Sequence, residues 1–84
     1  MNLTRPLVSL DLETTGTDVA TSRIVEVGIV KRYPDDCEEV FRWLVNPEVT
    51  IPSESIRVHG YTNEIARIQP PFAAVADDIA ATLA

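Results

Sequence analysis

Apolar and polar residues alternate along the first half of this chain with the two-residue period of β-strands. The pattern predicts strands over residues 7–13, 23–32 and 38–45. In the first strand, Val8, Leu10 and Leu12 share one face, which we expect to pack into a core. The second strand is apolar on both faces except at Glu26, which predicts a central strand covered on both sides. The short connections favour antiparallel pairing of the strands.

The second half of the chain changes to signals typical of helices. Pro and Ser stand at the start of a short helix predicted over residues 52–58, and Gly60 is suited to end it. Thr62 is placed to cap a further short turn. A longer helix is predicted from Phe72 to Leu83, after two prolines. One apolar stripe follows this helix and consists of Phe72, Val75, Ile79 and Leu83.

These elements together predict an α/β fold in which antiparallel strands are followed by short helical turns and one longer helix. A polar loop is expected over residues 14–22, and Phe41 and Trp43 are expected in the core. Gly28, inside the second strand, suggests the close approach of a neighbour. The acidic residues of the segment 35–39 lie at a predicted hairpin turn, where we expect them to be solvated, as we do Asp77 and Asp78.

Length and composition narrow the class of protein. Eighty-four residues allow one small domain, and 45% hydrophobic with 24% charged residues is ordinary for a globular chain. No apolar stretch is long enough to cross a bilayer and no signal-peptide pattern begins the chain, so we expect no membrane partner. The single Cys37 fits a reducing, cytoplasmic location. Its acidic neighbours disfavour the thiolate, so we interpret it as unreactive.

The chain is acidic, with a formal net charge of −6. This charge argues against a basic module that grips a nucleic-acid backbone over a long footprint. It does not exclude an enzyme that takes one strand end into an acidic pocket, where metal ions supply the positive charge.

Asp11 and Glu13 are the main candidates for chemistry. They stand two residues apart on a predicted strand, so both project from the same face. Two adjacent carboxylates repel each other and are costly to desolvate, and a divalent cation between them removes this cost. Oxygen ligands suit Mg²⁺ or Mn²⁺. The alternative is that both are ordinary polar residues at the end of a strand. A turn at Gly16 would leave backbone N–H groups near the carboxylates.

Four segments occur in an order that resembles the DEDD superfamily of 3′–5′ exonucleases. The segments are Asp-Leu-Glu-Thr-Thr-Gly at 11–16, Arg-Ile-Val-Glu-Val-Gly at 23–28, Leu-Val-Asn-Pro at 44–47 and Val-His-Gly-Tyr-Thr at 58–62. This superfamily has a ribonuclease-H-like fold and includes the DnaQ-like proofreading subunits of bacterial replicative polymerases and the oligoribonucleases. Tyr61 stands where Ile is commoner in the family. The second motif, with another Asp, and the third, with a His or Tyr and a final Asp, lie beyond the matched region.

The resemblance implies that residues 1–84 are the N-terminal part of a single exonuclease domain and carry its first catalytic motif only. It implies a metal-dependent 3′–5′ exonuclease, in which Asp11 and Glu13 are catalytic and bind metal. Asp11 would bridge two Mg²⁺ or Mn²⁺ ions in the complete domain, and Glu13 would bind one. The substrate-binding residues implied are Leu12, Thr14, Thr15 and His59.

The implied partners are the 3′ end of single-stranded DNA or RNA and a polymerase subunit. Glu26 is expected to have a structural role, because the family does not use it as a metal ligand. His59 is either a substrate contact or a satisfied structural residue. The competing hypothesis is a non-catalytic, truncated remnant that binds a nucleotide or a protein. Under either hypothesis we expect the 84-residue chain alone to be inactive, because two carboxylates do not complete a two-metal site.

Overall fold

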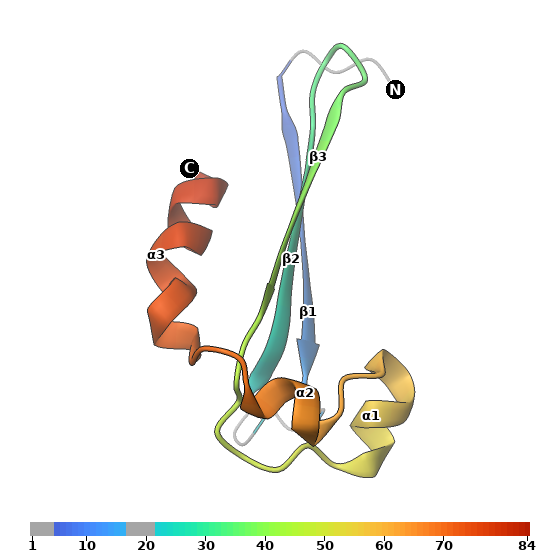
Figure 1. Cartoon of the computed structure of the whole chain (residues 1–84). Helices are drawn as coiled ribbons and strands as arrows, with labels where there is room; N and C mark the ends of the chain where they lie inside the picture. The colour runs from blue at the N-terminus through green and yellow to red at the C-terminus, as the bar shows by residue number, and fades with distance from the viewer. Residues whose placement is uncertain (1–4, 17–21) are drawn as a thin grey trace.

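A computed structural model describes residues 5–16 and 22–84, and it confirms the predicted order of strands and helices (Figure 1). Residues 17–21 of the expected polar loop lie outside the described residues. The bounds differ from the predicted ones by no more than about two residues, the usual scatter at element ends. The elements are β1 Leu7–Thr14, β2 Ile24–Arg32, β3 Glu38–Leu44, α1 Ser53–His59, α2 Asn63–Arg67 and α3 Phe72–Leu83.

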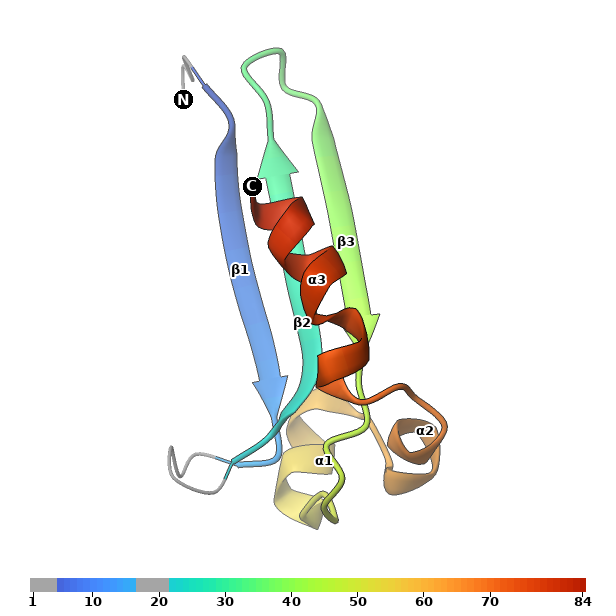
Figure 2. The same ribbon diagram turned by 90° about the vertical axis from the view of Figure 1, so that its left-hand side faces the viewer.

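The strands form one antiparallel sheet in the order β1-β2-β3, so β2 is central, as predicted. Val27 and Ile29 on β2 are buried together with Ile79 of α3, and Phe41 and Trp43 of β3 pack around them, as expected of core residues. Figure 2 shows α3 lying across the face of the sheet over β2. Burial of side chains of this size stabilises a fold by roughly 1.5–3 kcal/mol each, so this cluster holds α3 in place.

Two expectations about burial are wrong. The second face of β2, where Glu26 and Gly28 lie, is only half-buried, because α3 covers the other face. The side chains of Leu10 and Leu12 are 53% and 43% exposed rather than in a core. Within the described residues, β1 pairs with β2 alone and forms an edge of the sheet, while α3 packs mainly on β2.

The apolar stripe of α3 is covered only in its middle, since Phe72 and Leu83 near its ends are 42% and 43% exposed. One further expectation about packing, at Gly28, is wrong. At Gly28, an added Cβ would meet the Asp11 carbonyl oxygen at 3.7 Å, which is an ordinary van der Waals distance. No close approach of a neighbour therefore requires glycine there.

A second core cluster holds α1 and α2 at one end of the sheet. Val25, Ile51 and Ala66 are buried together, with Ile56 and Tyr61 packed against them. Gly60 ends α1 with a left-handed conformation, φ 79°, which suits glycine. At the start of α2, the hydroxyl of Thr62 accepts a hydrogen bond from the Ile65 N–H at 3.3 Å, as predicted. These contacts place α1 at the end of β1, on the side of the sheet away from α3 (Figures 1 and 2).

The opposite end of the sheet is the exposed hairpin between β2 and β3. Its acidic residues are solvated, as expected, and Glu38 forms an ion pair with Arg32 at 2.9 Å. Cys37 is exposed, and its hydrogen bond with the Asp35 carboxylate raises the pKa of the thiol above its ordinary value. This agrees with the interpretation of Cys37 as unreactive. Among the described residues, no helix has both the length and the apolar character needed to cross a bilayer.

Candidate active site

Asp11 and Glu13 lie on the face of the sheet that α3 leaves uncovered. In the register of β1 and β2, Asp11 is opposite Gly28 and Glu13 is opposite Glu26. Residues opposite each other in an antiparallel pair share a face, so the carboxylates of Glu13 and Glu26 are direct neighbours. Within residues 5–16 and 22–84, neither Asp11 nor Glu13 has a hydrogen bond or an ion pair from its side chain. Both carboxylates are thus available to a ligand from outside this part of the chain.

Glu13 lines a cavity of about 140 Å³ at the place where β1 meets α1. The Ser55 hydroxyl donates a hydrogen bond to the Thr15 carbonyl at 2.6 Å and fixes the first turn of α1 against the end of β1. The residues that line this cavity are Leu12, Glu13, Thr14, Gly16, Ser55, Val58 and His59. Four of the six predicted site residues, namely Leu12, Glu13, Thr14 and His59, are therefore brought together here.

Asp11 lies in a neighbouring hollow of about 150 Å³ on the same face. Asp11, Gly28 and Arg42 form one row across the three strands. Gly28, which has no side chain, stands between Asp11 and Arg42 in this row, and all three residues line the hollow. Glu26 also lines this hollow. The two predicted metal ligands therefore face adjacent hollows of one surface.

Thr15 does not line the cavity. Its side chain is 6% exposed, and its hydroxyl accepts a hydrogen bond from the Arg23 N–H at 2.9 Å. Its own N–H donates to the Arg23 carbonyl at 2.8 Å, so this backbone donor is not available to a ligand. The nearby Thr14 hydroxyl donates to the Gly16 carbonyl at 2.7 Å. Thr15 thus shapes the turn that supports the cavity.

His59, the last residue of α1, lines the cavity. Its Nδ1 accepts a hydrogen bond from the Tyr61 N–H at 3.0 Å. Because Nδ1 is an acceptor, the neutral imidazole carries its hydrogen on Nε2. Nε2 is buried and has no hydrogen-bond partner among the described residues. Buried polar atoms are nearly always satisfied, so this donor is suited to an acceptor atom of a ligand.

Tyr61 and Glu26 form a contact that the sequence reasoning missed. The Tyr61 hydroxyl donates a hydrogen bond to Glu26 Oε2. This bond, together with burial and the negative charges of Glu26 and Glu13, raises the pKa of Tyr61, while the positive charge of Arg42 opposes the shift. The only hint of this contact in the sequence was Tyr61 itself, which departs from the family pattern. No local pattern links Tyr61 to Glu26, which lies 35 positions away.

The donor set fits a hard divalent cation but is incomplete. The carboxylate oxygens of Asp11 and Glu13 are the ligand type that Mg²⁺ and Mn²⁺ prefer. Nowhere in the described residues do three or more His, Cys, Asp or Glu side chains lie close enough together to hold a metal ion. These two carboxylates can therefore form part of a metal site to which further ligands are added.

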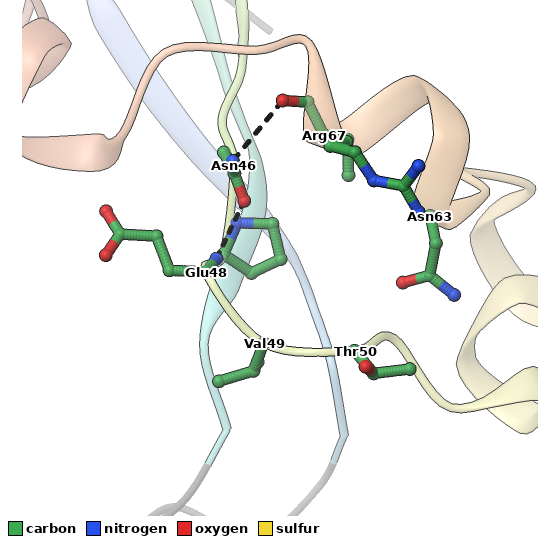
Figure 3. Close-up of a pocket in the computed structure, with 8 residues that line it drawn as sticks. Asn46, Glu48, Val49, Thr50, Asn63 and Arg67 are labelled. Carbon is green, nitrogen blue, oxygen red and sulfur yellow. Dashed lines mark hydrogen bonds between the residues drawn. The ribbon is translucent and has the colours of Figure 1, made fainter.

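Two larger cavities lie away from the carboxylates, with volumes of about 390 and 400 Å³. Figure 3 shows the first, in which the Asn46 side chain accepts from the Glu48 N–H at 2.8 Å and donates to the Arg67 carbonyl at 3.4 Å. The Asn63 side chain bonds both backbone groups of Ile51. These polar groups hold the loop after β3 in place, and no predicted site residue lines either cavity.

Comparisons with known proteins find matches over most of this chain. The RNase_T family model, described as Exonuclease, matches residues 8–84. The chain is 37% identical over 73 residues to the DNA polymerase III subunit epsilon of Rickettsia conorii and 36% identical to that of Rickettsia felis. Each alignment covers 84% of this chain and 32% of the relative, so the chain spans about a third of the length of these curated relatives.

Solved structures of exonuclease I share the fold. A complex of ExoI with SSB-Ct has a TM-score of 0.75 at 21% identity and covers 89% of this chain and 18% of that one. E. coli exonuclease I in complex with a 5cy-dA13 oligonucleotide has a TM-score of 0.77 at 20% identity and covers 93% and 18%. The ribonuclease-H-like arrangement of three antiparallel strands followed by helices is thereby confirmed.

Proposed function

This chain belongs to the RNase_T family of exonucleases, and we propose on that basis that residues 1–84 are the N-terminal part of one exonuclease domain and supply its first catalytic motif. The proposed activity is metal-dependent hydrolysis of phosphodiester bonds at the 3′ end of single-stranded DNA or RNA. The epsilon relatives are polymerase subunits by name, which favours a proofreading role and a polymerase subunit as partner.

One observation carries this proposal. A carboxylate from β1 and an imidazole from α1 line the same cavity, although Glu13 and His59 are far apart in the sequence. The cavity combines an acidic group, a buried Nε2 donor and apolar surface, to which Val58 contributes. This mixture suits a nucleotide at a strand end, with an anionic backbone, a hydroxyl and an apolar base.

Each residue has a proposed role. Asp11 and Glu13 would hold Mg²⁺ or Mn²⁺ in the complete domain. Bound divalent ions stabilise both the attacking and the leaving oxygen in phosphodiester hydrolysis. Glu13 and the backbone N–H of Thr14 hold the terminal 3′-hydroxyl, and the Nε2–H of His59 donates to a substrate oxygen. Leu12 contacts the base or sugar through its backbone, because its side chain projects from the opposite face of β1, paired with Val27. We assign no general base to this chain.

Cleavage by the complete protein that contains these residues tests the proposal. Asp11→Ala or Glu13→Ala removes a ligand, and release of nucleotides from a labelled oligonucleotide should fall by at least about a hundredfold, since metal stabilisation of the transition state amounts to several kcal/mol. Asp77→Ala, on the exposed face of α3, is the matched control and should retain activity.

Two outcomes would contradict the proposal. Turnover by the Asp11→Ala variant within a few-fold of the unaltered protein would overturn the site assignment. If the unaltered protein binds the oligonucleotide but does not cleave it with either Mg²⁺ or Mn²⁺, the hypothesis of a non-catalytic remnant would be favoured.

Metal binding also has a test that does not depend on activity. In the 84-residue chain, paramagnetic Mn²⁺ should broaden the amide resonances around Asp11, Glu13 and their β2 neighbours, because the effect falls off with distance from the ion. Asp11→Asn with Glu13→Gln should abolish the broadening at low Mn²⁺ concentration. Equal broadening in that double variant would place the ion elsewhere.

A further inference from the structure

Tyr61 joins the wall of the cavity to the sheet beneath it. Its backbone follows α1 directly after Gly60, and its hydroxyl donates to the carboxylate of Glu26. Glu26 stands directly opposite Glu13 in the β1–β2 register. A side chain at the end of α1 is thus bonded to the immediate neighbour of a proposed metal ligand.

Tyr61 also makes two contacts with His59. Its N–H donates to His59 Nδ1 at 3.0 Å, and its ring stacks on the imidazole with centroids 5.3 Å apart and planes at 27°. The first contact leaves the hydrogen of the neutral imidazole on Nε2, and the second limits rotation of the ring. The imidazole therefore takes its position from Tyr61.

The two ends of α1 are bonded to the sheet independently. The Ser55 hydroxyl in the first turn bonds the Thr15 carbonyl beyond β1, and the Tyr61 hydroxyl after the last turn bonds Glu26 on β2. Since Glu13 of β1 and His59 of α1 line one cavity, these two bonds hold the helix that carries His59 against the strand that carries Glu13. An apolar side chain at position 61 could pack in the same core cluster but could not form the second bond.

We propose that Tyr61 is a positioning residue, which through its hydrogen bond to Glu26 holds the imidazole of His59 in place against Glu13 for contact with the terminal nucleotide. The expected effect of Tyr61 on substrate binding rests on the proposed exonuclease function. The connection from Glu26 through Tyr61 to His59 does not depend on that function. Glu26 acts here as an anchor for Tyr61 and not as a metal ligand.

Nuclear magnetic resonance of the 84-residue chain tests the structural link, because the chain contains one His and two Tyr. The carbon-bound ring protons of His59 should be shifted upfield by the stacked ring of Tyr61. Tyr61→Phe and Glu26→Ala should each move these resonances towards their unstacked values. Glu26→Gln keeps a hydrogen-bond acceptor and should preserve the shift. Tyr33→Phe is the matched control, because Tyr33 also donates to a carboxylate, that of Glu39, at the far end of the sheet.

Kinetics of the complete protein test the consequence. Tyr61→Phe and Glu26→Ala should each raise the KM for an oligonucleotide about tenfold, the usual effect of losing a hydrogen bond to a charged group, with kcat little changed. The double variant should be no worse than either single variant, because both remove the same bond. Glu26→Gln should retain the original KM.

Several results would overturn the proposal. These are unchanged His59 resonances in Tyr61→Phe, additive effects in the double variant, or a lower kcat in Glu26→Ala alone, which would make Glu26 a direct participant. If activity in these variants falls only in parallel with the melting temperature, the Tyr61–Glu26 hydrogen bond stabilises the fold and does not position His59. If the unaltered protein cleaves nothing, the proposed function fails, while the resonance shifts still decide the link.

Discussion

Glu13 is the residue at which the two halves of the chain meet. It lies on β1, faces Glu26 of β2 and shares a cavity with His59 of α1. Some polar groups around Glu13 form hydrogen bonds within the protein, namely the backbone N–H of Thr15 and the hydroxyl of Tyr61. His59 Nε2, in contrast, is buried without a hydrogen-bond partner among the described residues. The groups that already form hydrogen bonds stabilise the fold, and the group without a partner can bind a ligand.

The free donor of His59 leads to a prediction about substrate binding. His59→Ala in the complete protein should raise KM several-fold, because the Nε2 donor has no hydrogen bond within the described part of the chain. The melting temperature should fall only slightly, by the loss of one hydrogen bond from the Tyr61 N–H and of the stacking on its ring. Steady-state kinetics beside thermal melts measure both effects, with the exposed Arg57→Ala of the same helix as control. An unchanged KM with lost stability would show that His59 is structural.

Tyr61 leads to a prediction about pH. The Glu26 carboxylate raises the pKa of Tyr61 above 10.0, the ordinary value for tyrosine. A pKa raised in the folded state means that the bond contributes its full stability below pH 10.0 and loses it as the pH rises through the folded-state pKa. In a Tyr33→Phe background, Glu26→Gln should therefore make Tyr61 ionise at lower pH, as measured by ultraviolet absorbance of tyrosinate. Identical titrations with Glu and Gln at position 26 would contradict the assignment of the cause.

At the scale of elements, α3 and α1 act on opposite faces of one sheet. The helix α3 buries Ile79 against Val27 and Ile29 and leaves the carboxylate face open. The shorter α1 contributes Ile56 to the other cluster and carries His59 to the end of β1. The sheet therefore separates the helix that stabilises the fold from the helix that completes the cavity.

Packing of α3 predicts a difference between two residues of its apolar stripe. Ile79→Ala in the 84-residue chain should lower the free energy of unfolding by about 2–5 kcal/mol, as large-to-small changes in a core do. Leu83→Ala should cost much less, because that side chain is 43% exposed while Ile79 is 7% exposed. Urea denaturation followed by circular dichroism measures both. Equal costs would mean that α3 is not held through Ile79.

At the scale of the whole molecule, the two edges of the sheet differ. The apolar side chains of β1, such as Leu10, are exposed at one edge. The other edge, β3, carries the charged residues Glu38, Glu39 and Arg42 among its seven residues. Charged side chains discourage pairing between edge strands, whereas an exposed apolar edge invites it.

This difference predicts the behaviour of the 84-residue chain on its own. It should release no nucleoside monophosphates from single-stranded DNA or short RNA with Mn²⁺, because Asp11 and Glu13 are two ligands of a larger set. It should also self-associate through β1, as measured by light scattering. Leu10→Lys should reduce the association, and Val40→Lys on β3, 56% exposed, should not. Metal-dependent cleavage by a pure monomer would contradict both expectations.

Much of this structure follows from local patterns. The period of two in the first strand already places Asp11 and Glu13 on one face, and the caps at Gly60 and Thr62 end and begin helices within a few residues. Such features depend on neighbours in the chain, so the sequence alone was sufficient to predict them. The order of motifs was likewise sufficient for the family.

Tertiary structure alone decided which groups meet. The sequence predicted that β2 would be covered on both faces and that Leu12 would be in a core, but these outcomes depend on where α3 lies. Glu13 and His59 share a cavity, and Tyr61 bonds Glu26, across 35 positions in the second case. No local pattern encodes such contacts, because they arise only when buried side chains of distant segments pack together and set the position of the polar groups beside them.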